Sequence, residues 1–166
     1  IGAGGAGCVT ALNIDHAPHV LIAGQTGAGK SVLMNTIICS LLLKNTPDAA
    51  RFVFIDPKQV EFSRFVDLPH VCPGDMVTST GGALTALQKL CTNMEDRYSR
   101  MKSAGLKTYT GQQVYIFIDE LADLMLTAGK IKKQVEECII RIAQKGRAAG
   151  YHLIIATQTP RSSVIT

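Results

Sequence analysis

A short stretch near the N-terminus, "GQTGAGKS" at residues 24–31, places a lysine and a serine among glycines directly behind the apolar run "HVLIA". It satisfies G-x-x-x-x-G-K-[ST], in which backbone N–H groups of a glycine-rich loop surround phosphate oxygens. A helix starting near Lys30 would add its positive dipole end. Lys30 would reach the β- and γ-phosphates, and Ser31 would give its hydroxyl to Mg²⁺. The stretch predicts a nucleoside triphosphate site; a plain glycine-rich turn is the alternative. The predicted nucleotide-binding residues are Gly24, Gln25, Thr26, Gly27, Ala28, Gly29, Lys30, Ser31 and Val32.

Two adjacent acids follow a second apolar run, "YIFIDEL". At the end of a strand Asp119 would present its carboxylate to the Mg²⁺ shell, together with Ser31. Glu120 would then orient and deprotonate a water molecule for attack on the γ-phosphate, which favours hydrolysis over phosphoryl transfer to another substrate. The alternative is a helix N-terminus that carries two acids because of its dipole.

The run "LIIATQ" ends in an uncharged amide, Gln158. Ligands of parallel sheets bind at the carboxyl ends of the strands. If this strand lies between the strand before the glycine-rich loop and the strand before Asp119, Gln158 faces the γ-phosphate and can sense it. A turn glutamine is the alternative. The sequence lacks the [NT]-K-x-D element of GTPases and the L-S-G-G-Q element of transporter-type ATPases. ATP is therefore the expected nucleotide, with Lys30, Glu120 and Gln158 as the catalytic set.

Composition bounds the class of protein. With 166 residues, 46% of them hydrophobic, the chain suits one domain with its own core. No apolar segment approaches the ~20 residues of a membrane helix, and no signal peptide is visible. A cytoplasmic excerpt of a longer protein is expected. The five cysteines are scattered and form no C-x-x-C pair, so neither a set of disulfides nor a zinc site is predicted. The net charge of +4 is compatible with an anionic partner but does not indicate one.

Buried strands that alternate with helices predict the fold. Strands are expected over 19–23, 51–56, 114–119 and 151–158, and helices from Lys30 to Pro47 and over 83–105 and 130–150. This order indicates an α/β fold with a mostly parallel sheet and helices on both faces. Residues 1–18 are expected to form a glycine-rich segment with an edge strand over 9–14, and 19–166 the core. Residues 57–75 are expected to be irregular.

Several phrases occur together and in a fixed order: "RFVFIDPKQVEF", "MEDRYSRM", "IDELADLM" and "RAAGYHLIIATQTP". From about Val9 to Thr166 the chain resembles the motor core of FtsK/SpoIIIE-type DNA translocases. The resemblance implies a RecA-like P-loop ATPase that hydrolyses Mg·ATP. It also implies a homo-hexameric ring around double-stranded DNA in bacterial division, sporulation or conjugation. By this resemblance Lys30 and Ser31 match the phosphate and Mg²⁺ positions, Asp119 and Glu120 the metal and base positions, and Gln158 the polar sensor.

The resemblance leaves the roles of two basic residues open. In "DPK", Lys58 would reach the nucleotide of a neighbouring subunit or fix its loop to Glu61. Arg147 is expected at a subunit interface. The other basic residues of its region are more simply a solvated helical face: Lys130, Lys132, Lys133, Arg141 and Lys145.

Some parts that the resemblance implies lie outside this sequence. They include a fifth sheet strand, an arginine that contacts a neighbour's γ-phosphate, and much of the DNA-facing surface. We therefore expect this chain alone to bind Mg·ATP and hydrolyse it slowly, without touching a membrane. Two other functions stay open: a secretion-system ATPase that threads polypeptide, and an assembly module that binds nucleotide without turnover. A small-molecule kinase is a more distant alternative, because no substrate lid is recognisable.

Overall fold

A parallel five-stranded sheet in the order β3-β7-β6-β4-β5 forms the centre of the computed structural model. The model describes residues 2–3, 9–14 and 16–158. The sheet strands are β3 (Val20–Ala23), β4 (Ala50–Ile55), β5 (Met76–Val77), β6 (Gln113–Ile118) and β7 (Tyr151–Thr157). Every neighbouring pair in this sheet is parallel. The predicted α/β class is confirmed.

The central strands are apolar on both faces because helices cover both faces. In β4 and β6 the aromatic side chains point to one face, where Phe52 lies opposite Tyr115 and Phe54 opposite Phe117. The Phe54 and Phe117 rings stack with centroids 5.2 Å apart. The intervening aliphatic side chains, among them Ile116, enter the core on the other face. This two-sided burial explains why these strands appear in the sequence as continuous apolar runs.

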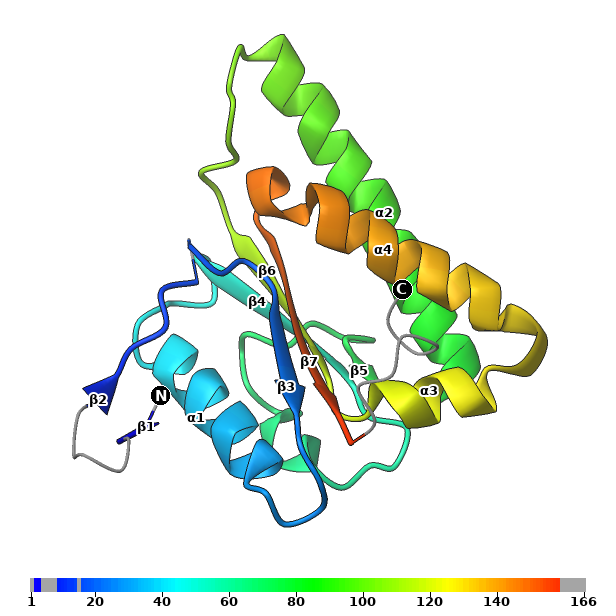
Figure 1. The fold of residues 1–166 in the computed structure, drawn as a ribbon. Helices are drawn as coiled ribbons and strands as arrows, with labels where there is room; N and C mark the ends of the chain where they lie inside the picture. Colours follow the sequence, from blue (N-terminus) through cyan, green and yellow to red (C-terminus); the bar gives the residue numbers. More distant parts are fainter. Residues whose placement is uncertain (1, 4–8, 15, 159–166) are drawn as a thin grey trace.

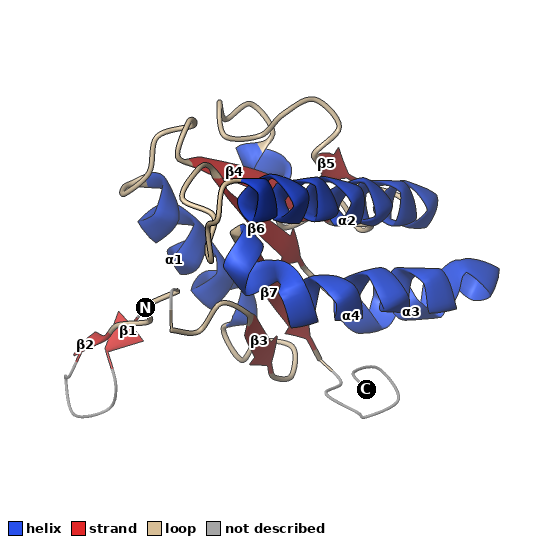
Figure 2. Cartoon of the chain, turned by 90° about the horizontal axis from the view of Figure 1, so that it is seen from above, coloured by secondary structure: helices blue, strands red, loops and turns tan. Residues whose placement is uncertain are grey.

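The helices divide between the two faces (Figures 1 and 2). Helix α1 (Lys30–Leu42) packs on the aromatic face, while α2 (Thr80–Ser103) and α4 (Lys132–Ala149) lie together on the opposite face. A short helix, α3 (Leu121–Thr127), follows β6 directly. No helix in the described part of the chain is both long and apolar enough to cross a membrane.

Close approach of α4 to β7 depends on glycine. A side chain at Gly146 would place its Cβ 2.8 Å from the carbonyl oxygen of Tyr151, so only glycine allows this packing. The helix then ends at Gly150, whose φ of 75° is left-handed and favours glycine. The chain reverses here and enters β7, which carries Gln158 at its far end.

Three local expectations differ from the structure. The strand expected over 9–14 is only β2 (Val9–Thr10), which pairs with β1 (Gly2–Ala3) and not with the main sheet. The irregular segment 57–75 contains a 3₁₀ turn (Ser63–Phe65), and β5 follows directly after it. Helix α3 is additional. Two or three residues of strand and one or two turns of helix are too short to leave a periodic pattern.

Parallel strands bring separate sequence segments to one edge. The chain leaves β3 into residues 24–31, β6 into Asp119 and Glu120, β7 into Gln158, and β4 into residues 56–62. The strand that leads into Gln158, β7, lies between β3 and β6, which is the strand order that the sequence-based prediction required for Gln158 to face the γ-phosphate.

Candidate nucleotide-binding site

A pocket of about 370 Å³ lies at this edge of the sheet. Its walls come from the glycine-rich loop, the first turn of α1, the segment after β4, and the ends of β6 and β7. The lining residues are Thr26, Gly27, Gly29, Lys30, Ser31, Val32, Lys58, Val60, Glu61, Asp119, Glu120 and Gln158. The structure thus brings together nine of the twelve site residues that the sequence predicted, including the whole catalytic set. The other three, Gly24, Gln25 and Ala28, belong to the glycine-rich loop but do not line the pocket.

The loop conformation requires glycine at two positions. Gly27 and Gly29 have φ angles of 81° and 86°, which L-residues with side chains rarely adopt. A Cβ at either position would meet no atom within 4 Å, so the backbone is open to an approaching ligand. At Gly24 the constraint is contact, since a Cβ there would lie 3.2 Å from that of Ala28.

Lys30 fits a phosphate ligand. Its ammonium donates hydrogen bonds to the loop carbonyls of Gly24, at 2.7 Å, and Gln25, at 3.1 Å. No carboxylate in the described part of the chain pairs with it. A cation held by neutral carbonyls at a helix N-terminus is suited to bind an anion.

Hard oxygen atoms gather beside Lys30 and fit a magnesium ion. The Ser31 hydroxyl donates to Glu61 Oε1 at 2.8 Å, and Asp119 stands at the end of β6 in the same pocket. Burial, followed by the nearby charges of Glu61, Asp56 and Glu120, raises the pKa of Asp119 to about 6 against the opposing effect of Lys58. The ionised form of such a carboxylate is unfavourable in the free protein and is stabilised when a cation binds beside it. Mg²⁺ prefers one or two carboxylates plus phosphate oxygens.

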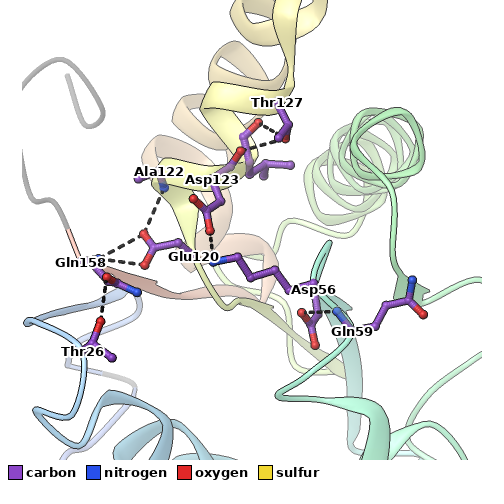
Figure 3. A network of polar contacts seen from close by, with 10 residues as sticks. Thr26, Asp56, Gln59, Glu120, Ala122, Asp123, Thr127 and Gln158 are labelled. Carbon is purple, nitrogen blue, oxygen red and sulfur yellow. Dashed lines mark hydrogen bonds and ion pairs between the residues drawn. The ribbon is translucent and has the colours of Figure 1, made fainter.

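Glu120 is held by backbone amides (Figure 3). Its side chain is the N-cap of α3 and accepts from Ala122 N at 3.3 Å, and both carboxylate oxygens accept from Gln158 N at 3.1 and 3.0 Å. The residue is buried. In this structure Glu120 therefore caps the helix, as the helix N-terminus interpretation expected. Because it also lines the pocket, the general-base role stays a prediction.

Gln158 connects Glu120 to the glycine-rich loop. Its backbone N–H binds Glu120, and its side-chain Oε1 accepts a 3.1 Å hydrogen bond from the Thr26 hydroxyl. Figure 3 shows Gln158 between Thr26 of the glycine-rich loop and Glu120, with dashed lines to both.

Comparisons with known proteins agree with this geometry. The family model for the FtsK/SpoIIIE family matches residues 2–113 and 110–162. The chain belongs to the FtsK/SpoIIIE family. A DNA translocase FtsK of Helicobacter pylori is 48% identical over 162 residues, and one of Streptococcus pyogenes is 41% identical over 179 aligned residues. These matches cover 90% and 96% of this chain but only 19% and 22% of the relatives, so the chain spans about a fifth of their length.

Solved structures show the same fold. The pCW3 conjugation coupling protein TcpA, in a monomer form with ATPγS, superposes with a TM-score of 0.77 at 27% identity, covering 93% of this chain and 46% of TcpA. EssC (ATPases 2 and 3) from Geobacillus thermodenitrificans has a TM-score of 0.77 at 18% identity, covering 92% and 30% of the two chains. The predicted RecA-like ATPase fold of the FtsK/SpoIIIE motor is thereby supported.

The "DPK" segment of this FtsK/SpoIIIE chain is organised by a buried acid. Asp56 accepts hydrogen bonds from the backbone N–H groups of Gln59, Glu61 and Phe62 at 2.9, 3.0 and 3.2 Å. Lys58 forms an ion pair with Asp123 of α3, and this contact raises the pKa of the lysine. The contact with Glu61 that the sequence suggested is not formed, because Glu61 is turned toward Ser31.

The basic residues around α4 lie away from the pocket. All six are exposed, and Arg141 pairs with Glu95 at 3.3 Å. This agrees with a solvated face for Lys130, Lys132, Lys133, Arg141 and Lys145. The interface role of Arg147 stays a prediction.

Sequence reasoning missed the role of Glu61, which lines the pocket, and the role of Asp123, which pairs with the pocket residue Lys58. Glu61 was considered only as a partner for Lys58, and Asp123 was not considered. The signal for Glu61 was its position in "DPKQVEF", five residues after the strand-end Asp56. The signal for Asp123 was a third acid in "IDELADLM", one helical turn beyond the base position.

Proposed function

We propose that this chain is the Mg·ATP-binding and ATP-hydrolysing core of a double-stranded DNA translocase. One observation carries the proposal: a single pocket combines the glycine-rich loop, the acids that follow β4 and β6, and the amide that follows β7. Family membership supports the motor assignment, and DNA as the substrate follows the DNA translocase relatives.

Each residue has a role in this proposal. The loop N–H groups and Lys30 hold the triphosphate, and Ser31 and Asp119 hold Mg²⁺. The metal would neutralise phosphate charge during attack by water. Glu120 takes the proton of that water as general base, for which it must release at least one of its contacts with Gln158 N and Ala122 N. Gln158 senses the γ-phosphate, and its contact with Thr26 places it beside the loop that binds the phosphates.

The remaining parts of the proposal concern the assembled motor. We propose a homo-hexamer around duplex DNA, on the cytoplasmic side of a membrane-anchored parent, without direct membrane contact by this chain. An arginine supplied by a neighbouring subunit is worth ~10³–10⁵ in rate at hydrolytic sites of this kind. We therefore expect the chain alone to bind Mg·ATP and to turn it over slowly.

The first test is nucleotide binding. A fluorescent ATPγS analogue should bind the chain with Mg²⁺, and Lys30→Ala should abolish or strongly weaken that binding. Lys44→Ala, at an exposed lysine just beyond α1, is the matched control and should bind normally. Equal binding by Lys30→Ala and the control would refute the site.

The second test concerns the substrate of the motor. ATP turnover by the full-length parent is measured alone, with duplex DNA and with unfolded polypeptide. Stimulation by DNA only is expected. Stimulation by polypeptide only would replace the DNA translocase with a secretion-type motor, and no turnover in any assembly would favour the nucleotide-binding assembly module.

A further inference from the structure

Glu61 is fixed in place from both sides of its backbone. Asp56 accepts the N–H of Glu61 at 3.0 Å and the N–H of Phe62 at 3.2 Å. Phe62 is fully buried and packs against Phe54 with ring centroids 4.8 Å apart. The chain therefore has little freedom at this position, although the segment is irregular. Its side chain extends from this anchor into the nucleotide pocket, which Asp119 also lines.

The contact with Ser31 has a direction that matters for metal binding. A serine hydroxyl has one proton and two lone pairs, so it can donate one hydrogen bond and still offer a lone pair. A hydroxyl that ligates a cation must send its proton to another acceptor. The Ser31 hydroxyl donates to Glu61 Oε1 at 2.8 Å, and no other acceptor for it occurs among the described residues. The proton is thus already directed away from the metal position.

The charge of Glu61 acts in the same sense. Mg²⁺ binds hard oxygen groups, and nearby negative charge strengthens its binding. Asp119 supplies one such charge on the β6 side of the pocket, and Glu61 supplies a second on the β4 side. Because Oε1 of Glu61 accepts the hydrogen bond from Ser31, Glu61 would act on a bound cation in two indirect ways. It would orient the Ser31 hydroxyl, and its negative charge would attract the cation.

We propose that Glu61 is a positioning residue for Mg²⁺: it accepts the Ser31 proton, so that the hydroxyl oxygen faces the cation, and it adds a second negative charge beside Asp119. This inference rests on the proposed function, because it concerns the metal that accompanies ATP. It assigns a role to the glutamate of "DPKQVEF" that neither the phosphate loop nor the acids after β6 provide.

The test separates metal binding from nucleotide binding. The affinity of a fluorescent ATPγS analogue is measured in EDTA and in excess Mg²⁺, and the ratio of the two values reports how strongly the metal supports the nucleotide. Glu61→Gln keeps an oxygen acceptor for Ser31 but removes the charge. Residues that orient metal ligands are typically worth 10–100-fold in metal affinity. We expect Glu61→Gln to reduce the ratio by about 10-fold or more and to leave the affinity in EDTA unchanged.

Three controls make the result specific. Asp67→Asn removes the same charge from an exposed acid of the same segment and should behave like the wild type. Glu61→Asp retains the charge and should restore part of the ratio. Glu61→Ala removes both the charge and the acceptor, and it should have a smaller effect in the Ser31→Ala background than in the wild type, because the hydroxyl that Glu61 orients is gone there. Thermal unfolding confirms that each variant is folded.

The possible failures are distinct. A Glu61→Gln ratio equal to that of Asp67→Asn overturns the inference while the proposed function stands. A loss of affinity of equal size in EDTA and in Mg²⁺ also overturns it, because Glu61 then only shapes the loop. A wild type that binds no nucleotide under either condition overturns the proposed function, and this inference with it.

Discussion

Glu120 gives the sharpest test of the site, because its contacts and its proposed chemistry predict different losses. In Glu120→Gln one side-chain oxygen becomes an NH₂ group, which cannot accept the hydrogen bond from Gln158 N. The remaining oxygen, Oε1, can keep its contacts with both Ala122 N and Gln158 N, so only the contact of Oε2 with Gln158 N is lost. Hydrogen bonds to charged groups contribute about 1.5–3 kcal/mol. Since one such contact is lost and two others become neutral, we expect the free energy of unfolding to fall by about 1–3 kcal/mol.

This loss should appear as a melting temperature lowered by about 2–12 °C, at about 2–4 °C per kcal/mol for a chain of this size. Nucleotide affinity should hardly change, because Glu120 reaches the glycine-rich loop only through Gln158 and Thr26. Hydrolysis should fall by 10²–10⁴, the usual contribution of a general base. The assays are circular dichroism on heating, binding of an ATPγS analogue, and single-turnover hydrolysis in the assembled parent motor.

Glu137→Gln, an exposed glutamate on α4, is the matched control and should change none of the three readouts. The reasoning fails if Glu120→Gln loses nucleotide binding to the same extent as Lys30→Ala, because Glu120 would then be part of the binding structure only. It also fails if the melting temperature drops while hydrolysis per folded molecule is unchanged.

Four further predictions concern charge. Because the pKa of Asp119 is raised to about 6, its ionisation opposes folding. The wild type should therefore lose stability relative to Asp119→Asn as the pH rises from about 4 to about 6. Urea denaturation of both proteins across this pH range measures the difference in the free energy of unfolding. Below pH 6 the same proton competes with Mg²⁺, so the support of ATPγS binding by the metal should weaken at low pH in the wild type. Asp75→Asn should cost about 2–3 kcal/mol, since it leaves the partly buried guanidinium of Arg51 without the carboxylate that it meets at 2.6 Å through both Nε and Nη2. Glu95→Gln, in an exposed pair, should cost less than ~1 kcal/mol in the same denaturation assay.

The sequence predicted the fold well where burial is two-sided. Strands β4, β6 and β7 are apolar on both faces. The glycine-rich loop marks where β3 ends and where α1 begins. It failed where the elements are short. Alternation over 9–14 did not distinguish a strand in the main sheet from a two-residue pairing elsewhere, and the two residues of β5 carry no pattern.

The site was predictable to the extent that strand ends determine it. In a parallel sheet every carboxyl end lies at one edge, so the residues after β3, β6 and β7 had to meet once the strand order was known. Glu61 and Lys58 are different, because they lie in an irregular segment. Their directions follow from the buried carboxylate of Asp56 and the left-handed φ of 59° at Gln59. No periodicity in the sequence reports such a turn.

A chain of contacts links the glycine-rich loop to Glu120, the proposed base. Thr26 belongs to the loop that surrounds the phosphates, and its hydroxyl holds the side chain of Gln158. The backbone of the same residue holds Glu120, which begins α3. A γ-phosphate that attracts either the Thr26 hydroxyl or the Gln158 amide would break the first contact, and the freed Gln158 could then loosen the second. Because α3 also carries Asp123, the partner of Lys58, a change at Glu120 would extend to the segment after β4 that carries Glu61. Glu120 as the proposed base, Gln158 as the proposed sensor and the segment that carries Glu61 are therefore linked by a chain of contacts at the carboxyl edge of the sheet.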